Sequence, residues 1–297
     1  MKTLFYYFIT FLSKILGSWV FVILSRGVAA GYFLFFPRRA AVGVRFYRAL
    51  FPGRSLFYYL LCTWKQYQNF TSVFLDRYLL LDSDDTTYTS KGQEYLEAAM
   101  EKTGGIILMS HMGNWEVAAH LLKQQHEHIR MLLYMGIHNK EEIERIQKKD
   151  LGDSGIQIIA VDQDGGSPFD IMKGIQFLKS GGFVSLTGDI VWKKDQRTVP
   201  VRFLGHEVHL PEVPYIFALL SGAPLFIFFT FRVAGSRYHF TLSEPIFLKA
   251  PSRAQRKEVI QQAAQKYAVL LEQALHRHPF EWYHFEPFLE QEKEMEQ

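Results

Sequence analysis

Cysteine is almost absent from this chain of 297 residues, in which Cys62 is the single thiol. One cysteine excludes an intrachain disulfide framework and a metal site built from several cysteines. The chain also lacks the composition of a disordered or fibrous protein, because 48% of its residues are hydrophobic and 15% are aromatic. That apolar content is enough for a sizeable core, in one large domain or two small ones.

Acidic residues are missing from the amino-terminal quarter, where nine lysines and arginines precede the first acidic residue, Asp76. The same quarter holds close to half of the aromatic residues. Cations interleaved with aromatic and aliphatic runs are typical of a segment that binds an anionic membrane surface. A nucleic-acid surface would mix its cations with polar residues, so we expect no nucleic-acid partner.

The apolar stretch over residues 4–24 is long enough to cross a bilayer, but Lys14 in its middle makes spanning costly, by about 2.5–3.5 kcal/mol. No small-x-small cleavage site follows, so we expect an anchor and not a cleaved signal peptide. Helices lying in the interface are favoured, with one tilted transmembrane helix as the alternative. The arginines that come next indicate that the rest of the chain is cytoplasmic; they are Arg38, Arg39, Arg45 and Arg48.

Short apolar runs alternate with amphipathic segments beyond the polar residues 82–93. The predicted strands are 105–110, 130–134, 156–161, 183–187, 224–233 and 238–242, and the predicted helices are 114–125, 140–149, 168–179, 214–220 and 252–276. This alternation predicts an α/β fold with a mostly parallel central sheet flanked by helices. We therefore expect a membrane-associated helical region over 1–80, an α/β domain over 81–289 and an acidic tail over 290–297.

The chemistry-bearing residues cluster directly after the first predicted strand, where His111 lies in the turn before a helix. Ligands of such sheets bind at the carboxyl ends of the strands. Gly113 permits a tight turn, Asn114 is placed to cap the helix, and Glu116 falls in its first turn. A carboxylate beside an imidazole fixes its tautomer and stabilises the imidazolium formed when it takes a hydroxyl proton. His111 and Glu116 are therefore the candidate catalytic pair.

Two other interpretations stay open. His120 lies four residues after Glu116, and with His111 the three side chains form the ligand set of a metal-dependent hydrolase. A non-catalytic membrane scaffold is the other alternative. The motif His206-Glu207-Val208-His209 is one residue short of zincin spacing and falls on a predicted β segment, so we expect no metal there. The chain has no Gly-x-Ser-x-Gly elbow, no Gly-x-Gly-x-x-Gly and no Walker loop.

The segment Ser110–Glu116 resembles the His-x4-Asp/Glu signature of the lysophospholipid acyltransferase superfamily, and within it the lipid A late acyltransferases (lauroyl/myristoyl acyltransferases). Further segments resemble this family in the same order along the chain. They are Pro37–Arg39 with Arg45–Pro52, Phe169–Gly182 with Gly188-Asp189, Arg197–Gly205 and His278–Trp282. Three departures stand out: Asn139 lies where the family has an Arg-Pro pair, and Ile190 and Glu281 each replace a glutamine.

The resemblance implies a membrane-associated O-acyltransferase of lipid A-like biosynthesis, at the cytoplasmic side of a bacterial inner membrane. It would move a fatty acyl chain from acyl carrier protein or CoA to a hydroxyl of a lipid or glycolipid, with no cofactor or metal. His111 would act as general base, oriented by Glu116, and backbone N–H groups near Gly113 or a basic side chain would stabilise the oxyanion. The residues expected to bind substrate are Gly113, Asn114, Trp115, Asp189, Arg197 and Arg202.

Overall fold

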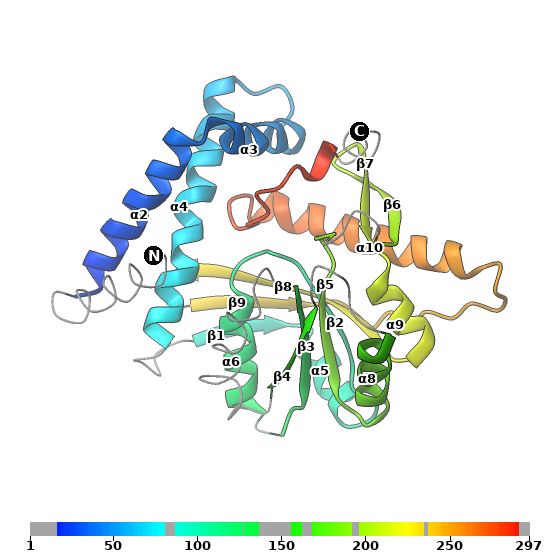
Figure 1. Cartoon of the computed structure of the whole chain (residues 1–297). Coiled ribbons are helices and arrows are strands. Elements are labelled where there is room, and N and C mark those ends of the chain that lie inside the picture. Colours follow the sequence, from blue (N-terminus) through cyan, green and yellow to red (C-terminus); the bar gives the residue numbers. More distant parts are fainter. Residues whose placement is uncertain are drawn as a thin grey trace.

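The computed structural model shows a helical arm at the amino terminus beside an α/β body (Figure 1). It describes residues 17–80, 87–126, 128–136, 156–161, 168–191, 196–234 and 237–290. Several predictions fall outside the described residues. They concern the part of the anchor that precedes residue 17, Asn139, the helix over 140–149 and all of the acidic tail except residue 290.

The arm consists of α2 (Ser18–Phe35), α3 (Pro37–Leu50) and α4 (Leu56–Leu80). Pro37 opens α3, at a position where a helix needs no backbone N–H. Both α2 and α3 pack against α4. Among the described helices, none is by itself long and apolar enough to cross a bilayer; α2 and α3 meet that criterion only as a pair bent by 91°.

The central sheet of the described residues has seven strands in the order β1-β9-β8-β2-β5-β3-β4. Every neighbouring pair is parallel except β8 with β9, so the predicted α/β fold with a mostly parallel sheet is confirmed. The strands are β1 (Thr87–Lys91), β2 (Gly105–Met109), β3 (Met131–Gly136), β4 (Ile156–Val161), β5 (Phe183–Thr187), β8 (Leu225–Ala234) and β9 (Arg237–Leu242).

Helices cover both faces of the sheet, and strand β2 shows how the core divides between them. Ile106 and Leu108 join the larger core, which includes Leu271 of α10, whereas Ile107 and Met109 join a second cluster against α5 and α6. A strand that is apolar on both faces is expected in a parallel sheet covered on both sides. The flanking helices are α5 (Gln93–Met100), α6 (Trp115–Gln125), α8 (Pro168–Lys179), α9 (Val213–Ser221) and α10 (Arg256–Arg277).

Strand β1, helix α5, a strand over 198–203 and a short helix near the carboxyl terminus were not predicted, whereas the β segment predicted at 206–209 is present. Strand β1 and helix α5 form in and just after the polar residues 82–93. The sequence does not reveal β1 because it is a mostly exposed edge strand, which pairs only with β9 in the described sheet. Strands β6 (Thr198–Phe203) and β7 (His206–Pro211) form a separate antiparallel hairpin packed against α10. The carboxyl-terminal chain then returns across the body to η2 (Phe288–Glu290).

Candidate active site

Two neighbouring strands end at the same level and carry the site. Strands β2 and β5 are parallel neighbours, with Met109 paired to Thr187 at their carboxyl ends. His111 lies two residues beyond the end of β2, and Asp189 lies two residues beyond the end of β5. Because the offset is the same on both strands, the fold brings these two side chains together at the strand ends, where ligands of parallel sheets bind.

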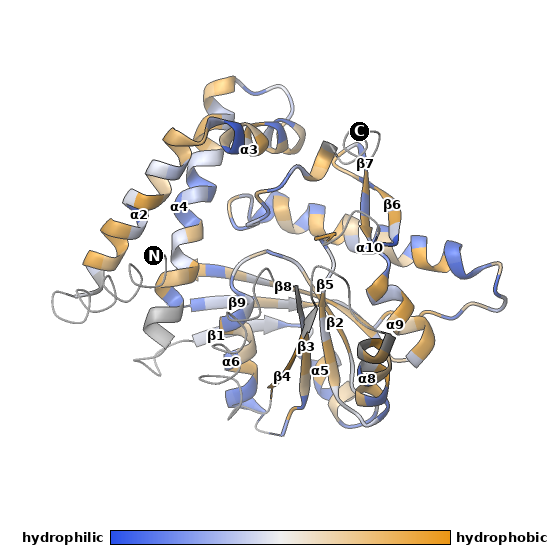
Figure 2. Cartoon of the chain, viewed as in Figure 1, coloured by the Kyte–Doolittle hydropathy of each residue, from blue (hydrophilic) through white to orange (hydrophobic). Residues whose placement is uncertain are grey.

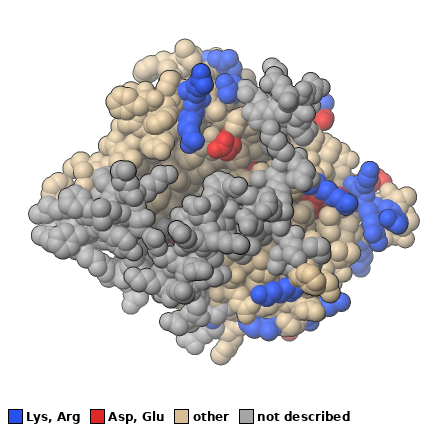
Figure 3. All heavy atoms as spheres, in the orientation of Figure 1, with Lys and Arg blue, Asp and Glu red and all other residues tan. Residues whose placement is uncertain are grey.

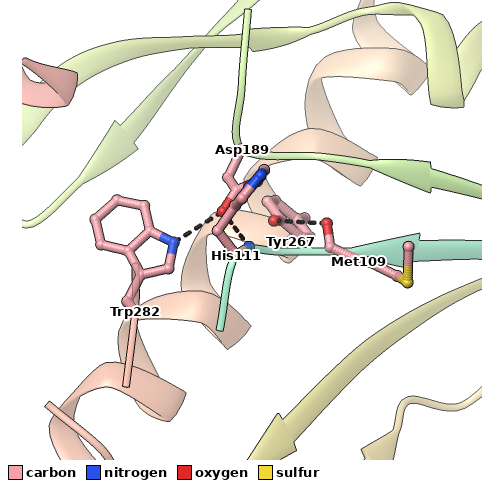
Figure 4. Close-up of polar contacts among 5 residues, drawn as sticks. All are labelled: Met109, His111, Asp189, Tyr267 and Trp282. Carbon is pink, nitrogen blue, oxygen red and sulfur yellow. Dashed lines mark hydrogen bonds and ion pairs between the residues drawn. The ribbon is translucent and has the colours of Figure 1, made fainter. Parts of the chain in front are cut away.

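Asp189 holds His111 at two points (Figure 4). The backbone N–H of His111 donates to Asp189 Oδ2 at 2.7 Å, and His111 Nδ1 lies 2.9 Å from Asp189 Oδ1. The Asp189 side chain is completely buried, whereas that of His111 is 29% exposed. When Nδ1–H donates to the carboxylate, the lone pair of the ring is on Nε2.

The two groups shift each other's pKa. Burial alone would lower the pKa of His111, but the charge of Asp189 and its hydrogen bond raise that pKa above its ordinary value. Burial alone would raise the pKa of Asp189, yet the interactions with His111 bring it down to about 2. Asp189 therefore stays ionised near neutral pH, and His111 is a stronger base than a free imidazole.

The carboxyl-terminal segment Glu281–Tyr283 lies antiparallel to the loop that carries His111. Gly113 N–H donates to the carbonyl oxygen of Glu281 at 2.8 Å, and Tyr283 N–H donates to that of His111 at 2.7 Å. Between them, the indole N–H of Trp282 donates to Asp189 Oδ2 at 2.8 Å. A segment from the far end of the chain thus contacts both members of the pair.

Gly113 is required by the backbone. Its φ is +65°, and a Cβ there would lie 2.1 Å from the carbonyl oxygen of Thr230 on β8. The close approach therefore serves packing onto β8. The N–H groups of His111 and Gly113 already donate within the protein, so the expectation that N–H groups near Gly113 stabilise an oxyanion finds no support at these two residues.

Asn114 caps α6 as its position predicts. Its side-chain oxygen accepts from the backbone N–H of Glu116 at 3.2 Å and of Val117 at 3.4 Å. Asn114 is buried, and its amide donates to the carbonyl of Val73 in α4 at 3.4 Å. The capping role is confirmed; substrate binding by Asn114 stays a prediction.

Glu116 lies in the first turn of α6, as predicted. The carboxylate at Nδ1 of His111 is that of Asp189, and an orienting role for Glu116 stays a prediction. Asp189 contacts the candidate base in this structure, and substrate binding by Asp189 stays a prediction. The sequence places His111 and Asp189 each just after a predicted strand, but only the strand order shows that the ends of these two strands are neighbours.

Three other candidate residues are exposed, one on α6 and two at strand β6. Arg197 precedes β6 and Arg202 lies on it; both are exposed, and within the described residues neither guanidinium bonds to His111 or Asp189. His120 is exposed on α6. Across the described part of the chain, no group of three His, Cys, Asp or Glu side chains is placed to hold a metal ion, so His111, Glu116 and His120 do not form one.

A family model described as bacterial lipid A biosynthesis acyltransferase matches residues 77–290, which include His111, Asp189 and Trp282. The match covers well over half of the chain. No curated protein matches the chain.

Proposed function

Because the chain belongs to the family of bacterial lipid A biosynthesis acyltransferases, we propose that it transfers a fatty acyl chain from a thioester to a hydroxyl group of a lipid or glycolipid. The thioester donor is acyl carrier protein or CoA. The observation that carries the proposal is the His111–Asp189 pair, a partly exposed base held by a buried carboxylate at the ends of adjacent parallel strands.

In the proposed mechanism, both substrates bind together and no covalent enzyme intermediate forms. Nε2 of His111 takes the proton of the acceptor hydroxyl while the hydroxyl oxygen attacks the carbonyl carbon of the thioester. The tetrahedral intermediate collapses, the carbon–sulfur bond breaks, and the imidazolium returns the proton to the leaving thiolate. Asp189 stabilises the imidazolium because its negative charge lies 2.9 Å from Nδ1.

An apolar cavity on the α5–α6 side of the sheet supports an acyl substrate. It has a volume of about 60 Å³ and lies between the sheet and helices α5 and α6. Met109 and Trp115, which flank His111 in the sequence, belong to its wall. The lining residues farther from the loop include Leu96, Ile107, Ala119 and Met131. We assign this cavity to the acyl chain, because apolar walls stabilise an alkyl chain by about 0.8 kcal/mol per buried CH₂.

Filling the cavity is expected to shorten the preferred acyl chain. In the Ala119→Phe variant, a ring occupies space near Trp115, so preference for the longest accepted donor over one two carbons shorter should fall by about tenfold. Rates measured with a series of acyl thioesters test this. His120→Phe, which adds the same ring one residue away on the exposed side of α6, is the control. An unchanged chain-length preference in Ala119→Phe would show that this cavity does not bind the acyl chain.

The helical arm supports a membrane location. Large apolar side chains are exposed at the α2–α3 bend and at the start of α4, including Phe35 at 80% and Phe57 at 76%. Figure 2 shows that much of the α2 ribbon carries the colour of hydrophobic residues. Lysine and arginine side chains stand at the top of the molecule, where α3 lies, and Arg38, Arg39, Arg45 and Arg48 are exposed there (Figure 3). We propose that this surface binds the anionic cytoplasmic face of the bacterial inner membrane.

Replacing Phe35 and Phe57 together by serine is expected to weaken binding to vesicles containing anionic phospholipid by at least about tenfold, because two rings that enter the interface are lost. Co-sedimentation with vesicles measures this. Phe247→Ser, at a site 58% exposed outside the arm, is the matched control. Equal binding by the double variant and the control would place the membrane contact elsewhere.

The function itself is tested by mass spectrometry of membrane lipids from cells with and without this chain. We expect one lipid species to lack a single acyl chain in its absence, and only a chain with an intact His111 to restore it. An unchanged lipid profile, or equal restoration by His111→Ala, would contradict the proposal.

A further inference from the structure

Trp282 is among the most buried side chains of the molecule, and its one polar atom is directed at the active site. The residue is 1% exposed, and its indole N–H donates to Asp189 Oδ2 at 2.8 Å (Figure 4). Aromatic rings from three parts of the chain enclose it, and they are Phe46, Phe203, His284 and Phe288.

We propose that Trp282 is a positioning residue for acyl transfer, acting on His111 through Asp189. Its N–H fixes the orientation of the carboxylate and limits the negative charge that the imidazole experiences. This inference rests on the proposed function, in which His111 is the general base.

The bonding of Asp189 shows why one more donor matters. Oδ1 faces the imidazole, while Oδ2 accepts from the backbone N–H of His111 and from the indole of Trp282. Two donors on Oδ2 hold the carboxylate plane, so that Oδ1 stays directed at Nδ1. A charge that is already oriented needs no reorganisation when the imidazolium forms. A neutral N–H donor also takes up part of the carboxylate's hydrogen-bonding capacity and makes it a weaker base.

Trp282 is itself fixed from several sides. Its carbonyl oxygen accepts from the Nε2 amide of Gln66 in α4 at 2.6 Å. The neighbouring Glu281 accepts the backbone N–H of Arg232 in β8 at 2.7 Å through its carboxylate. With the bonds from Gly113 to Glu281 and from Tyr283 to His111, the segment is tied to α4, β8 and the His111 loop. The indole therefore has a defined position from which to hold Asp189.

Two further titratable groups face Asp189 in the described structure, and both stay neutral near pH 7. Burial lowers the pKa of His284 to about 4. Burial raises the pKa of Tyr267 well above its ordinary value, and its hydroxyl donates to the carbonyl of Met109. Asp189 is thus the charge that sets the pKa of His111, and the donors on Asp189 modulate it.

The test removes the N–H while keeping the ring. 3-Benzothienylalanine at position 282 replaces the N–H by sulfur in a bicycle of nearly the same shape, and Trp282→Phe is the simpler variant. Without this donor the carboxylate attracts the imidazolium more strongly. The acid limb of kcat/KM should therefore move up by about half a pH unit. We expect kcat to fall about tenfold with little change in KM for the thioester.

Phe288→Leu is the control, because it loosens the same aromatic cluster without touching Asp189. It should lower the melting temperature but leave the acid limb in place. A folded 282 variant whose acid limb and kcat match those of Phe288→Leu would overturn the positioning role. That outcome is distinct from failure of the proposed function, which would show as transfer activity surviving in His111→Ala.

Discussion

Replacing His111 by alanine is expected to lower the rate of acyl transfer by about a thousandfold or more, because the other imidazole that faces Asp189, His284, has a pKa lowered to about 4 and is a much weaker base. The variant should still fold: the His111 ring is 29% exposed, and the backbone N–H that bonds to Asp189 remains. Initial rates with purified protein, an acyl thioester and a lipid acceptor measure the effect. Thermal unfolding verifies the fold.

His120→Ala is the matched control for this experiment. His120 is exposed on α6, and we expect near-normal rates without it. Full activity in His111→Ala would show that His111 is not the general base. Equal losses in both variants, together with dependence on added metal, would favour the metal-dependent hydrolase instead.

Replacing Asp189 by asparagine is expected to lower kcat by about a hundredfold or more, because the amide keeps the shape of the side chain and removes the charge that stabilises the imidazolium. The pH dependence should also change. Transfer needs neutral His111, so activity is lost as the pH falls through its raised pKa. Without the charge, burial lowers that pKa, and the acid limb of kcat/KM should move to lower pH.

Glu116→Gln is the comparison that separates the two carboxylates. Whatever its effect on turnover, we expect it to leave the acid limb in place, since the raised pKa of His111 arises from Asp189. If the limb moves in Glu116→Gln and not in Asp189→Asn, Glu116 is the group that sets the pKa of His111 and the assignment of Asp189 is wrong.

The fold was largely predictable because buried parallel strands leave a clear pattern. The strand over 183–187 was predicted with its observed bounds, and β2 within one residue, because glycines bound short apolar runs. Strand β1 gave no such pattern: it lies at the edge of the sheet with four of its five residues exposed, so its composition is that of a loop.

The site was predictable only in part. His111 was found because it directly follows a buried strand, and Asp189 lies at an equivalent place after another. Glu116 is the acidic residue nearest to His111 in the sequence, so the sequence favours it as the orienting carboxylate, whereas contact between His111 and Asp189 depends on β5 lying next to β2. Strand order is set by packing over the whole sheet, and no local pattern records it. The contact of Trp282 with Asp189 likewise depends on tertiary packing that no local sequence pattern records.

In our proposal Asp189 controls the proton affinity of His111, and direct titration of that imidazole tests this control. NMR of protein carrying labelled histidine, with the His111 signals assigned by their loss in His111→Gln, reports its pKa. We predict a pKa above the ordinary value of about 6.5, lowered in Asp189→Asn and unchanged in Glu116→Gln. A His111 that titrates at or below 6.5, with the same pKa in Asp189→Asn, would contradict the account.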